Sequence, residues 1–310
     1  MMQETRSGLT NTGKQDSAAQ SVQAGQLPME QPTAKAMWRL LLFFIFYMIF
    51  RLLVETAISV GFLAFGPGMP EPFRSFFMMP SDSPEMEMML SGNSQVLVSA
   101  VGFIVAGLMI RAKAFEYDGK YSPKKETGKQ FYILAAIASV SIAIFMNILI
   151  VKSGIIAISD EYAEVAENQY ACSFIVGFIV YGFISPISEE LMFRGILYNG
   201  FKRYFKMTAA LLMSAAFFSI YHGNGIQGMY SFVVSVFIIY SYEHTGNFLM
   251  PVMIHMICNL TAYVMTYEYE LMSEKTILAI FAASFVVSAA CIVLMFFRDK
   301  IPVLKKAADE

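Results

Sequence analysis

Residues 183–195 read FISPISEELMFRG, an apolar stretch that carries three ionisable side chains, Glu189, Glu190 and Arg194. Apolar residues continue on its N-terminal side to Cys172, which gives the length that an α-helix needs to cross a hydrocarbon core of roughly 30 Å. A helix is expected because every backbone polar group at membrane depth must be bonded within the segment. Ionisable groups there cost on the order of 3 kcal/mol or more, so they are functional candidates. This stretch therefore predicts a transmembrane helix with a chemical role.

The rest of the chain has the composition of a membrane protein. Hydrophobic residues make up 56% of it, charged residues make up 15%, and the mean hydropathy is +0.54, whereas a soluble domain is about a quarter charged. We predict an all-α, polytopic integral membrane protein of about eight transmembrane helices, with its chemistry in the second half. The predicted spans are Trp38–Phe65, Val96–Ile110, Phe131–Val151, Cys172–Gly195, Thr208–Tyr221, Gly228–Tyr242, Phe248–Thr266 and Thr276–Phe297.

The distribution of Lys and Arg predicts the orientation, since cytoplasmic connections are enriched in them. With the N-terminus inside, the cytoplasmic segments hold 15 basic residues and the opposite segments hold 3. We therefore predict a multi-pass plasma-membrane protein with both termini cytoplasmic, and an odd number of spans would break the alternation. The cytoplasmic set is Lys35, Arg39, Arg111, Lys113, Lys120, Lys124, Lys125, Lys129, Lys202, Arg203, Lys206, Arg298, Lys300, Lys305 and Lys306, and the opposite set is Arg74, Lys152 and Lys275. The outer connections are acidic, with Asp82, Glu85, Glu87, Asp160, Glu161, Glu164 and Glu167.

Composition also divides the chain and limits its partners. Residues 1–35 are polar and without apolar periodicity, which predicts a disordered cytoplasmic tail, and 298–310 predict a second tail. Residues 36–165 hold the N-terminal helices and loops, and 166–297 hold the segment of interest. The net charge of −2 does not indicate nucleic acid, and membrane lipid is the expected surrounding. The cysteines at 172, 258 and 291 lie in apolar spans, which favours packing over disulfides.

Two clusters of ionisable residues lie at membrane depth. Arg51 and Glu55 are four residues apart in the first span, where opposite charges on one helix face can pair. We interpret them as an ion pair that neutralises itself. The alternative is that the first hydrophobic stretch is partly interfacial, which would place Arg51 near the headgroups.

The second cluster is in the fourth span. Glu189 and Glu190 point about 100° apart on a helix, so they cannot share one role. Arg194 is four residues after Glu190 and is expected to neutralise it, which leaves Glu189 without a partner in its own helix. Pro186 frees a backbone carbonyl and would permit a kink. An unpaired carboxylate at that depth must be neutral or find partners on other helices.

Partners for Glu189 occur in two later spans. His222 ends the fifth span, and His255 and Asn259 lie four apart on one face of the seventh. The third histidine, His244, falls in a short connection. Each membrane histidine alone is more often structural, but together these side chains could form a catalytic site. A carboxylate supplies a base, an imidazole orients water, and an amide stabilises an oxyanion.

These motifs resemble the CPBP membrane proteins, which include type II CAAX prenyl endopeptidases, bacterial abi proteins and lysostaphin-resistance proteins. Residues 189–195 are similar to the family's EExxxR motif, residues 218–222 to FxxxH, and residues 255–259 to HxxxN. All three occur in order on separate apolar segments within roughly 170–265. The resemblance implies that 166–297 are a CPBP/abi-like intramembrane protease core acting on a membrane-associated or lipidated peptide or protein.

By this resemblance, Glu189 and His222 activate water, His255 and Asn259 stabilise the oxyanion, and Glu190 and Arg194 support the site. Zinc on Glu189, His222 and His255 is possible, but HExxH is absent and Asn259 is a poor zinc ligand, which favours catalysis without a cofactor. The alternatives are a non-catalytic membrane scaffold or bacteriocin-immunity-type protein, and a transporter.

One geometric condition follows from the predicted spans. If the fourth span ends at Gly195, Glu189 lies near its inner end, whereas His222 lies near the outer end of the fifth span. At 1.5 Å per residue they would differ in depth by about 10 Å or more. We therefore expect that a catalytic site requires a longer, kinked fourth helix that continues toward Arg203.

Overall fold

The computed structural model describes residues 29–81, 88–122 and 127–297. Most of the predicted N-terminal tail, the C-terminal tail and the charged residues at 82–87, 124 and 125 lie outside these ranges. The α-helices are α2 (Ala34–Phe65), α3 (Phe73–Phe77), α4 (Gly92–Tyr121), α5 (Lys129–Ser153), α6 (Asp160–Tyr170), α7 (Phe174–Ile179), α8 (Ser185–Glu190), α9 (Asn199–Lys202), α10 (Met207–Tyr221), α11 (Gly225–Thr245), α12 (Leu249–Glu268) and α13 (Glu274–Phe297). Two π-helical segments, η3 (Val180–Ile184) and η4 (Leu191–Tyr198), join α7, α8 and α9 into one rod.

The helical prediction is confirmed, with one short addition. Among the described residues, seven helices are long and apolar enough to cross a membrane. The predicted fifth span is α10, a helix of 15 residues or about 22 Å, which is shorter than a typical bilayer core, so the count of eight spans is not confirmed. Strands β1 (Met78–Pro80) and β2 (Met88–Leu90) form a small antiparallel hairpin that the hydropathy pattern did not predict.

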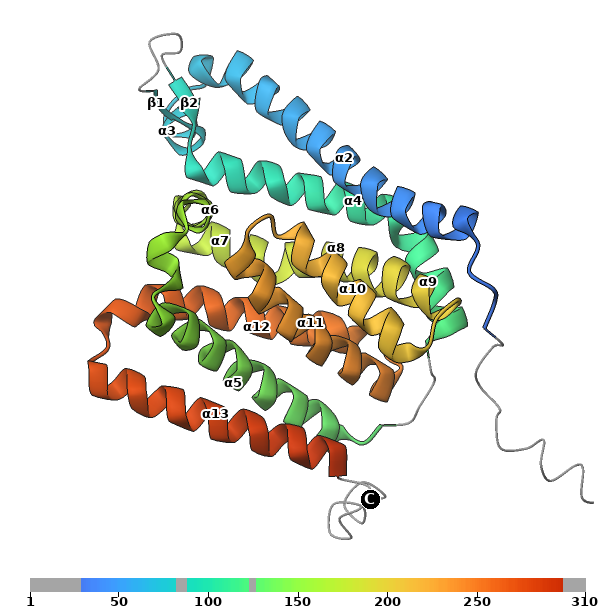
Figure 1. Cartoon of the computed structure of the whole chain (residues 1–310). Helices are drawn as coiled ribbons and strands as arrows, with labels where there is room; N and C mark the ends of the chain where they lie inside the picture. The colour runs from blue at the N-terminus through green and yellow to red at the C-terminus, as the bar shows by residue number, and fades with distance from the viewer. Residues whose placement is uncertain (1–28, 82–87, 123–126, 298–310) are drawn as a thin grey trace, which may run out of the picture.

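The helices form three layers (Figure 1). The pair α2 and α4 lies on one side, and the pair α5 and α13 lies on the other. The rod from α7 to α9, the helices α10 and α11, and α12 fill the space between these pairs. Leu40 and Tyr47 are the buried residues of α2. Its remaining apolar surface suits lipid contact, because a helix that is apolar all round must meet protein or lipid.

The fourth span is longer than the prediction that ended it at Gly195. The rod is one apolar helix from Phe174 to Lys202, because apolar residues continue after Gly195 and are buried. Glu189 therefore lies near the middle of the rod, and the fourth helix has the extra length that the predicted catalytic site requires. A Cβ on Gly195 would lie 2.5 Å from the Cβ of Ala114 in α4, so glycine is required for this close packing. A kink was predicted near Pro186, and the helix has π-helical turns on both sides of α8. Such turns are common at functional sites.

Helices α10 and α11 form an antiparallel hairpin with its tip at residues 222–224. Gly223 has φ of +76°, a left-handed conformation that glycine adopts without strain. The Ser219 hydroxyl donates to the carbonyl of Gly228 at 2.8 Å and ties the two arms together. The hairpin returns the chain to the end from which it entered, whether or not its tip crosses the bilayer. The predicted alternation therefore does not depend on α10 being a complete span.

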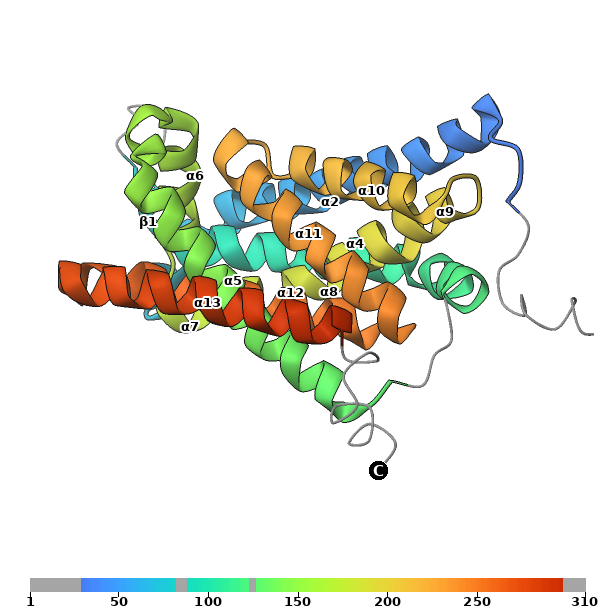
Figure 2. The ribbon, with the colours of Figure 1, turned by 60° about the horizontal axis from the view of Figure 1, so that its bottom comes forward.

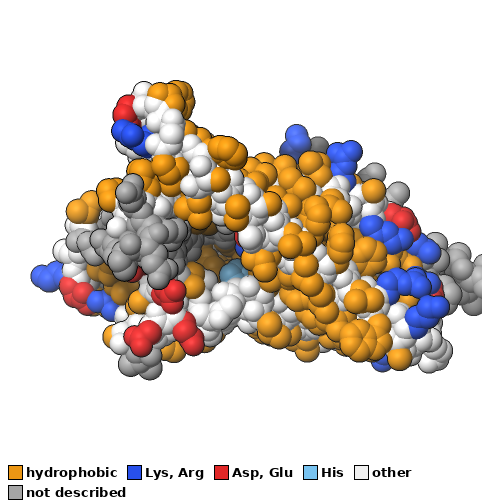
Figure 3. Space-filling view, turned by 90° about the horizontal axis from the view of Figure 1, so that it is seen from above, with side chains coloured by type: hydrophobic (Ala, Val, Ile, Leu, Met, Phe, Trp, Pro, Cys, Tyr) orange, Lys and Arg blue, Asp and Glu red, His pale blue; other side chains and the backbone are white. Residues whose placement is uncertain are grey.

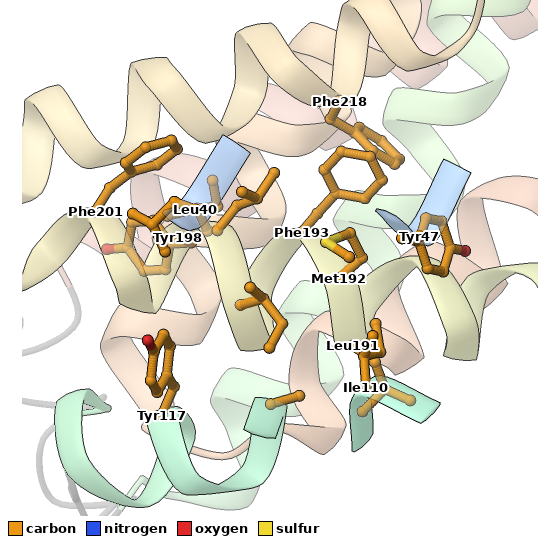
Figure 4. Packing of buried hydrophobic residues seen from close by; sticks show 14 of the residues in the cluster. Leu40, Tyr47, Ile110, Tyr117, Leu191, Met192, Phe193, Tyr198, Phe201 and Phe218 are labelled. Atoms are coloured by element: carbon orange, nitrogen blue, oxygen red, sulfur yellow. The ribbon is translucent and has the colours of Figure 1, made fainter. Parts of the chain in front are cut away.

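A packed apolar core joins α2, α4, η4 and α10. Figure 4 shows Leu191, Met192, Phe193 and Tyr198 pointing between these helices. Every residue of η4 is buried. This half of the rod is therefore held rigidly by side chains from three neighbours.

Charge separates along the helix direction. Figure 3 shows most of the visible Lys and Arg at one end of the molecule, most acidic side chains with a few basic ones at the other, and a hydrophobic belt between them. We call these the basic end and the acidic end. The basic end holds the start of α2 and the end of α4, and the acidic end holds β1, β2 and α6. The acidic connection expected at 160–167 is the helix α6, whose residues Asp160, Glu161, Glu164 and Glu167 are exposed.

Candidate active site

Glu190 is committed to an ion pair inside the protein. Its Oε1 atom accepts from Arg194 Nη1 at 2.8 Å, and both side chains are fully buried. Arg194 also donates to the Ser235 hydroxyl at 3.0 Å and lies over the ring of Phe218 at 4.7 Å. The structure thus pairs Arg194 with Glu190, and the neighbouring carboxylate remains for another use.

His255 of α12 lies between the two carboxylates. Its Nδ1 is 2.7 Å from Glu190 Oε1, and its Nε2 is 3.6 Å from Glu189 Oε2. The carboxylate at Glu190 is an acceptor, so Nδ1 carries a proton and donates to it. This bond fixes the imidazole with Nε2 directed toward Glu189. Sequence reasoning placed these residues in one site but could not predict that one ring would join both acids.

Glu189 lies at the inner end of a cavity. Its side chain accepts a hydrogen bond from the Ser185 hydroxyl at 2.5 Å. Ser185 is one turn earlier on the same helix, so the prediction that Glu189 has no partner in its own helix was wrong, although this partner is not charged. The residue is only 5% exposed, and the exposed part faces the cavity that Ser185 also lines. This carboxylate therefore combines burial with access to a small open space.

His222 lies at the tip of the α10–α11 hairpin and lines the same cavity. Its Nδ1 is 2.7 Å from the carbonyl of Phe218, an acceptor, so Nδ1 donates and Nε2 keeps a lone pair. The ring of Phe218 packs edge-on against His222 at 4.8 Å and against His255 at 5.4 Å between centroids. Phe218 is thus the spacer between the two imidazoles, which gives the FxxxH spacing a structural reason.

Asn259 lines the cavity one turn after His255. Its Nδ2 donates to the carbonyl of Tyr181 in η3 at 3.0 Å. The amide has a second N–H, so it can still donate to a group in the cavity. Of the four residues predicted to be catalytic, Glu189, His222 and Asn259 line the cavity, whereas His255 lies behind Glu189 and is 3% exposed.

The cavity has a volume of about 300 Å³. Figure 3 shows a hollow in the surface, with a histidine side chain visible inside it. Six tyrosines contribute to the wall, which combines aromatic rings with hydroxyl groups. The lining residues are Met48, Arg51, Phe103, Asn147, Ile150, Val151, Tyr162, Gln169, Tyr170, Tyr181, Ser185, Glu189, Tyr221, His222, Ile226, Gln227, Tyr230, Asn259, Ala262 and Tyr263.

Arg51 and Tyr221 are site residues that the sequence did not identify. The Arg51 Nε donates to Glu55 at 2.8 Å, which confirms the predicted ion pair. The same guanidinium also donates to the Tyr221 hydroxyl and lies 4.2 Å above the ring of Phe103. The Tyr221 hydroxyl is also hydrogen-bonded to that of Tyr47, so Arg51, Tyr221 and Tyr47 form one polar chain beside the cavity. Because the sequence already explained Arg51 by its pairing with Glu55, it did not indicate the contact of Arg51 with Tyr221 at the cavity.

The three residues proposed as zinc ligands do not form a compact donor set. No group of three or more His, Cys, Asp or Glu able to hold a metal ion occurs within 29–81, 88–122 and 127–297. We therefore derive no catalytic step through a metal. The three cysteines are free and buried, as the sequence predicted.

Comparison with known families agrees with the motif analysis. Residues 171–261, from the loop before α7 to the middle of α12, match the family model described as "Type II CAAX prenyl endopeptidase Rce1-like". Comparisons with curated proteins and with solved structures gave no match. The matched segment contains Glu189, Glu190, Arg194, His222, His255 and Asn259, and leaves out the helix that carries Arg51. Residues 171–261 are therefore similar to the Rce1-like type II CAAX prenyl endopeptidases.

Proposed function

We propose that this protein is an intramembrane endopeptidase in which Glu189 activates water. One observation carries the proposal: Glu189 faces a polar cavity near the middle of the Phe174–Lys202 helix, and the nearby Arg194 is bound to Glu190 instead. A structural carboxylate at this depth would be expected in an ion pair, as Glu190 is. The family match supports hydrolysis of a peptide bond as the reaction class.

The lining residues supply the required chemical steps. A water molecule between Glu189 and His222 can donate one proton to the carboxylate and the other to the free Nε2 of the imidazole. As the water oxygen attacks the peptide carbonyl carbon, Glu189 takes up a proton and the carbonyl oxygen becomes negative. The second N–H of Asn259 stabilises this oxyanion. Glu189 then returns its proton to the leaving amine, which breaks the C–N bond.

We assign positioning roles to His255 and Glu190. His255 lies behind Glu189 and is held by Glu190, so its contact is with the base and not with the oxyanion. This differs from the role that the family resemblance implied. Glu190 and Arg194 keep the imidazole in place from the packed side of the rod.

The proposed substrate is a peptide or protein segment that is membrane-associated or lipidated. The aromatic wall of the cavity suits an apolar segment, and its hydroxyl and amide groups suit the backbone of an extended peptide. The hydrophobic belt around the molecule supports a site at membrane depth.

A chelation experiment tests the metal-free mechanism. The purified full-length protein in nanodiscs is treated with a strong chelator, and its zinc content is measured by elemental analysis. We expect peptide cleavage to stay within about twofold of the untreated rate, because no step uses a metal. Loss of cleavage on chelation, with recovery on adding zinc alone, would contradict this mechanism.

A comparison of membrane peptidomes tests the function itself. Strains lacking the protein, carrying the wild type, and carrying Glu189→Ala or Glu164→Gln are compared by mass spectrometry. We expect peptides that accumulate without the protein to accumulate equally with Glu189→Ala and to disappear with Glu164→Gln, the matched exposed control. If the Glu189→Ala strain instead resembled the wild type, the peptidase would be wrong and a non-catalytic scaffold or immunity role would be favoured.

A further inference from the structure

The cavity occupies only one half of the molecule. Helix α5 contributes Asn147, Ile150 and Val151, which are near its end at Ser153 on the acidic end. The rod begins at the acidic end, and its lining residues stop at Glu189, near its middle. The space therefore runs from mid-membrane toward the acidic end.

Helix α6 forms the outer wall of this space. Tyr162, Gln169 and Tyr170 line the cavity, while the acidic residues of α6 are exposed. A helix of 11 residues is about 17 Å long, too short to cross a bilayer. Figure 2 shows α6 near the tip of the α10–α11 hairpin, and residues of all three helices line the cavity.

Toward the basic end, the protein is closed. Beyond Glu189, the buried residues of η4 fill the rod's surroundings, as Figure 4 shows. Polar contacts seal the last turns, since Asn199 donates to the Tyr242 hydroxyl at 2.9 Å and Lys202 pairs with Glu243. Among the described residues, the cavity lining includes none from η4 or α9.

The charge distribution indicates which side of the membrane this opening faces. Lys and Arg mark the cytoplasmic side, and they gather at the closed end. We propose that the active-site cavity opens to the non-cytoplasmic side, beside α6. The substrates are then peptides whose cleaved bond enters from the outer half of the bilayer, and not the cytoplasmic C-termini of proteins. The statement on substrates rests on the proposed peptidase, whereas the side of the opening does not.

Labelling of single cysteines tests the side without using activity. The native cysteines are replaced, and one cysteine is introduced at Gln169 in the cavity wall, at the exposed Glu164, or at the exposed Arg111 of the basic end. A charged, membrane-impermeant maleimide is then added to intact and to permeabilised cells. We expect Gln169→Cys and Glu164→Cys to react in intact cells, and Arg111→Cys to react at least tenfold more after permeabilisation.

The reverse pattern would overturn the proposal. Glu164→Cys repeats the test at an exposed site where substitution cannot disturb packing, so the result does not depend on the cavity variant folding. A second arm places one lipid-anchored, quenched fluorescent peptide on either side of proteoliposomes with known protein orientation. Cleavage from the side on which Glu164→Cys reacts supports the proposal, and cleavage from the other side overturns it. With outer labelling and no cleavage from either side, the opening would stand and the peptidase would fail.

Discussion

The two halves of the rod from Phe174 to Lys202 surround their polar side chains differently. In the half toward the basic end, polar groups face protein partners, as in the pair of Glu190 and Arg194. In the half toward the acidic end, Glu189 faces an open cavity together with side chains from seven other helices. The boundary falls between two adjacent glutamates. A change in the packed half should therefore alter stability, and a change in the open half should alter activity.

The largest expected effect is in the open half. Glu189→Gln removes the base but keeps the shape of the side chain, and loss of general base catalysis costs roughly 10²–10⁴-fold in rate. We expect cleavage of a lipid-anchored fluorescent peptide to fall by that factor, with little change in the melting temperature. A variant that unfolds more easily but still cleaves would reverse the assignment of Glu189.

The second effect is in the packed half. Arg194→Met leaves the carboxylate of Glu190 buried without its cation, which destabilises a protein by about 3–5 kcal/mol. We expect this loss in the free energy of unfolding, measured by denaturant titration in detergent. The double variant Glu190→Gln/Arg194→Met is the control and should recover part of it. Unchanged stability of Arg194→Met would show that the pair is not structural.

The third effect is again catalytic. Asn259→Ala removes the proposed oxyanion donor, and loss of one such donor costs about 10²-fold in kcat. Because the bond forms mainly in the transition state, KM should change little. Steady-state kinetics on the same peptide separates the two constants. A rise in KM with constant kcat would make Asn259 a substrate-binding residue instead.

The smallest effect concerns a residue that the motifs do not include. Tyr221→Phe removes the hydroxyl that holds Arg51 at the cavity wall and should slow cleavage by roughly two- to tenfold, the value of one hydrogen bond of about 1 kcal/mol. Tyr240→Phe is a tyrosine change outside the cavity lining and serves as the control. Equal rates for Tyr221→Phe and wild type would exclude a contribution from this hydroxyl.

Much of the fold could be predicted because the bilayer imposes a length and a composition on each helix. The end of the fourth span was wrong because Gly195 looked like a terminus. The close contact with Ala114 explains why a glycine stands within a continuing helix. Helix α6 was missed since its acidic residues resembled those of a loop.

The sequence predicted which residues form the candidate site, but not which of them contact one another. The spacing of Glu189, His222 and His255 indicated one centre. The bond between His255 and Glu190 depends on tertiary packing, which no local pattern contains. Arg51 was set aside because its pairing with Glu55 was visible in the sequence, whereas its position beside Tyr221, far along the chain, was not.

The hairpin of α10 and α11 also bears on how the chain can change over evolution. Helix α10 starts, and helix α11 finishes, at the same end of the protein. Inserting or deleting a residue in α10 therefore moves the tip of the hairpin without inverting any later helix. The depth of His222 is thereby uncoupled from the sidedness of α12 and α13. A lineage can adjust how far into the bilayer its second imidazole reaches while its topology stays unchanged.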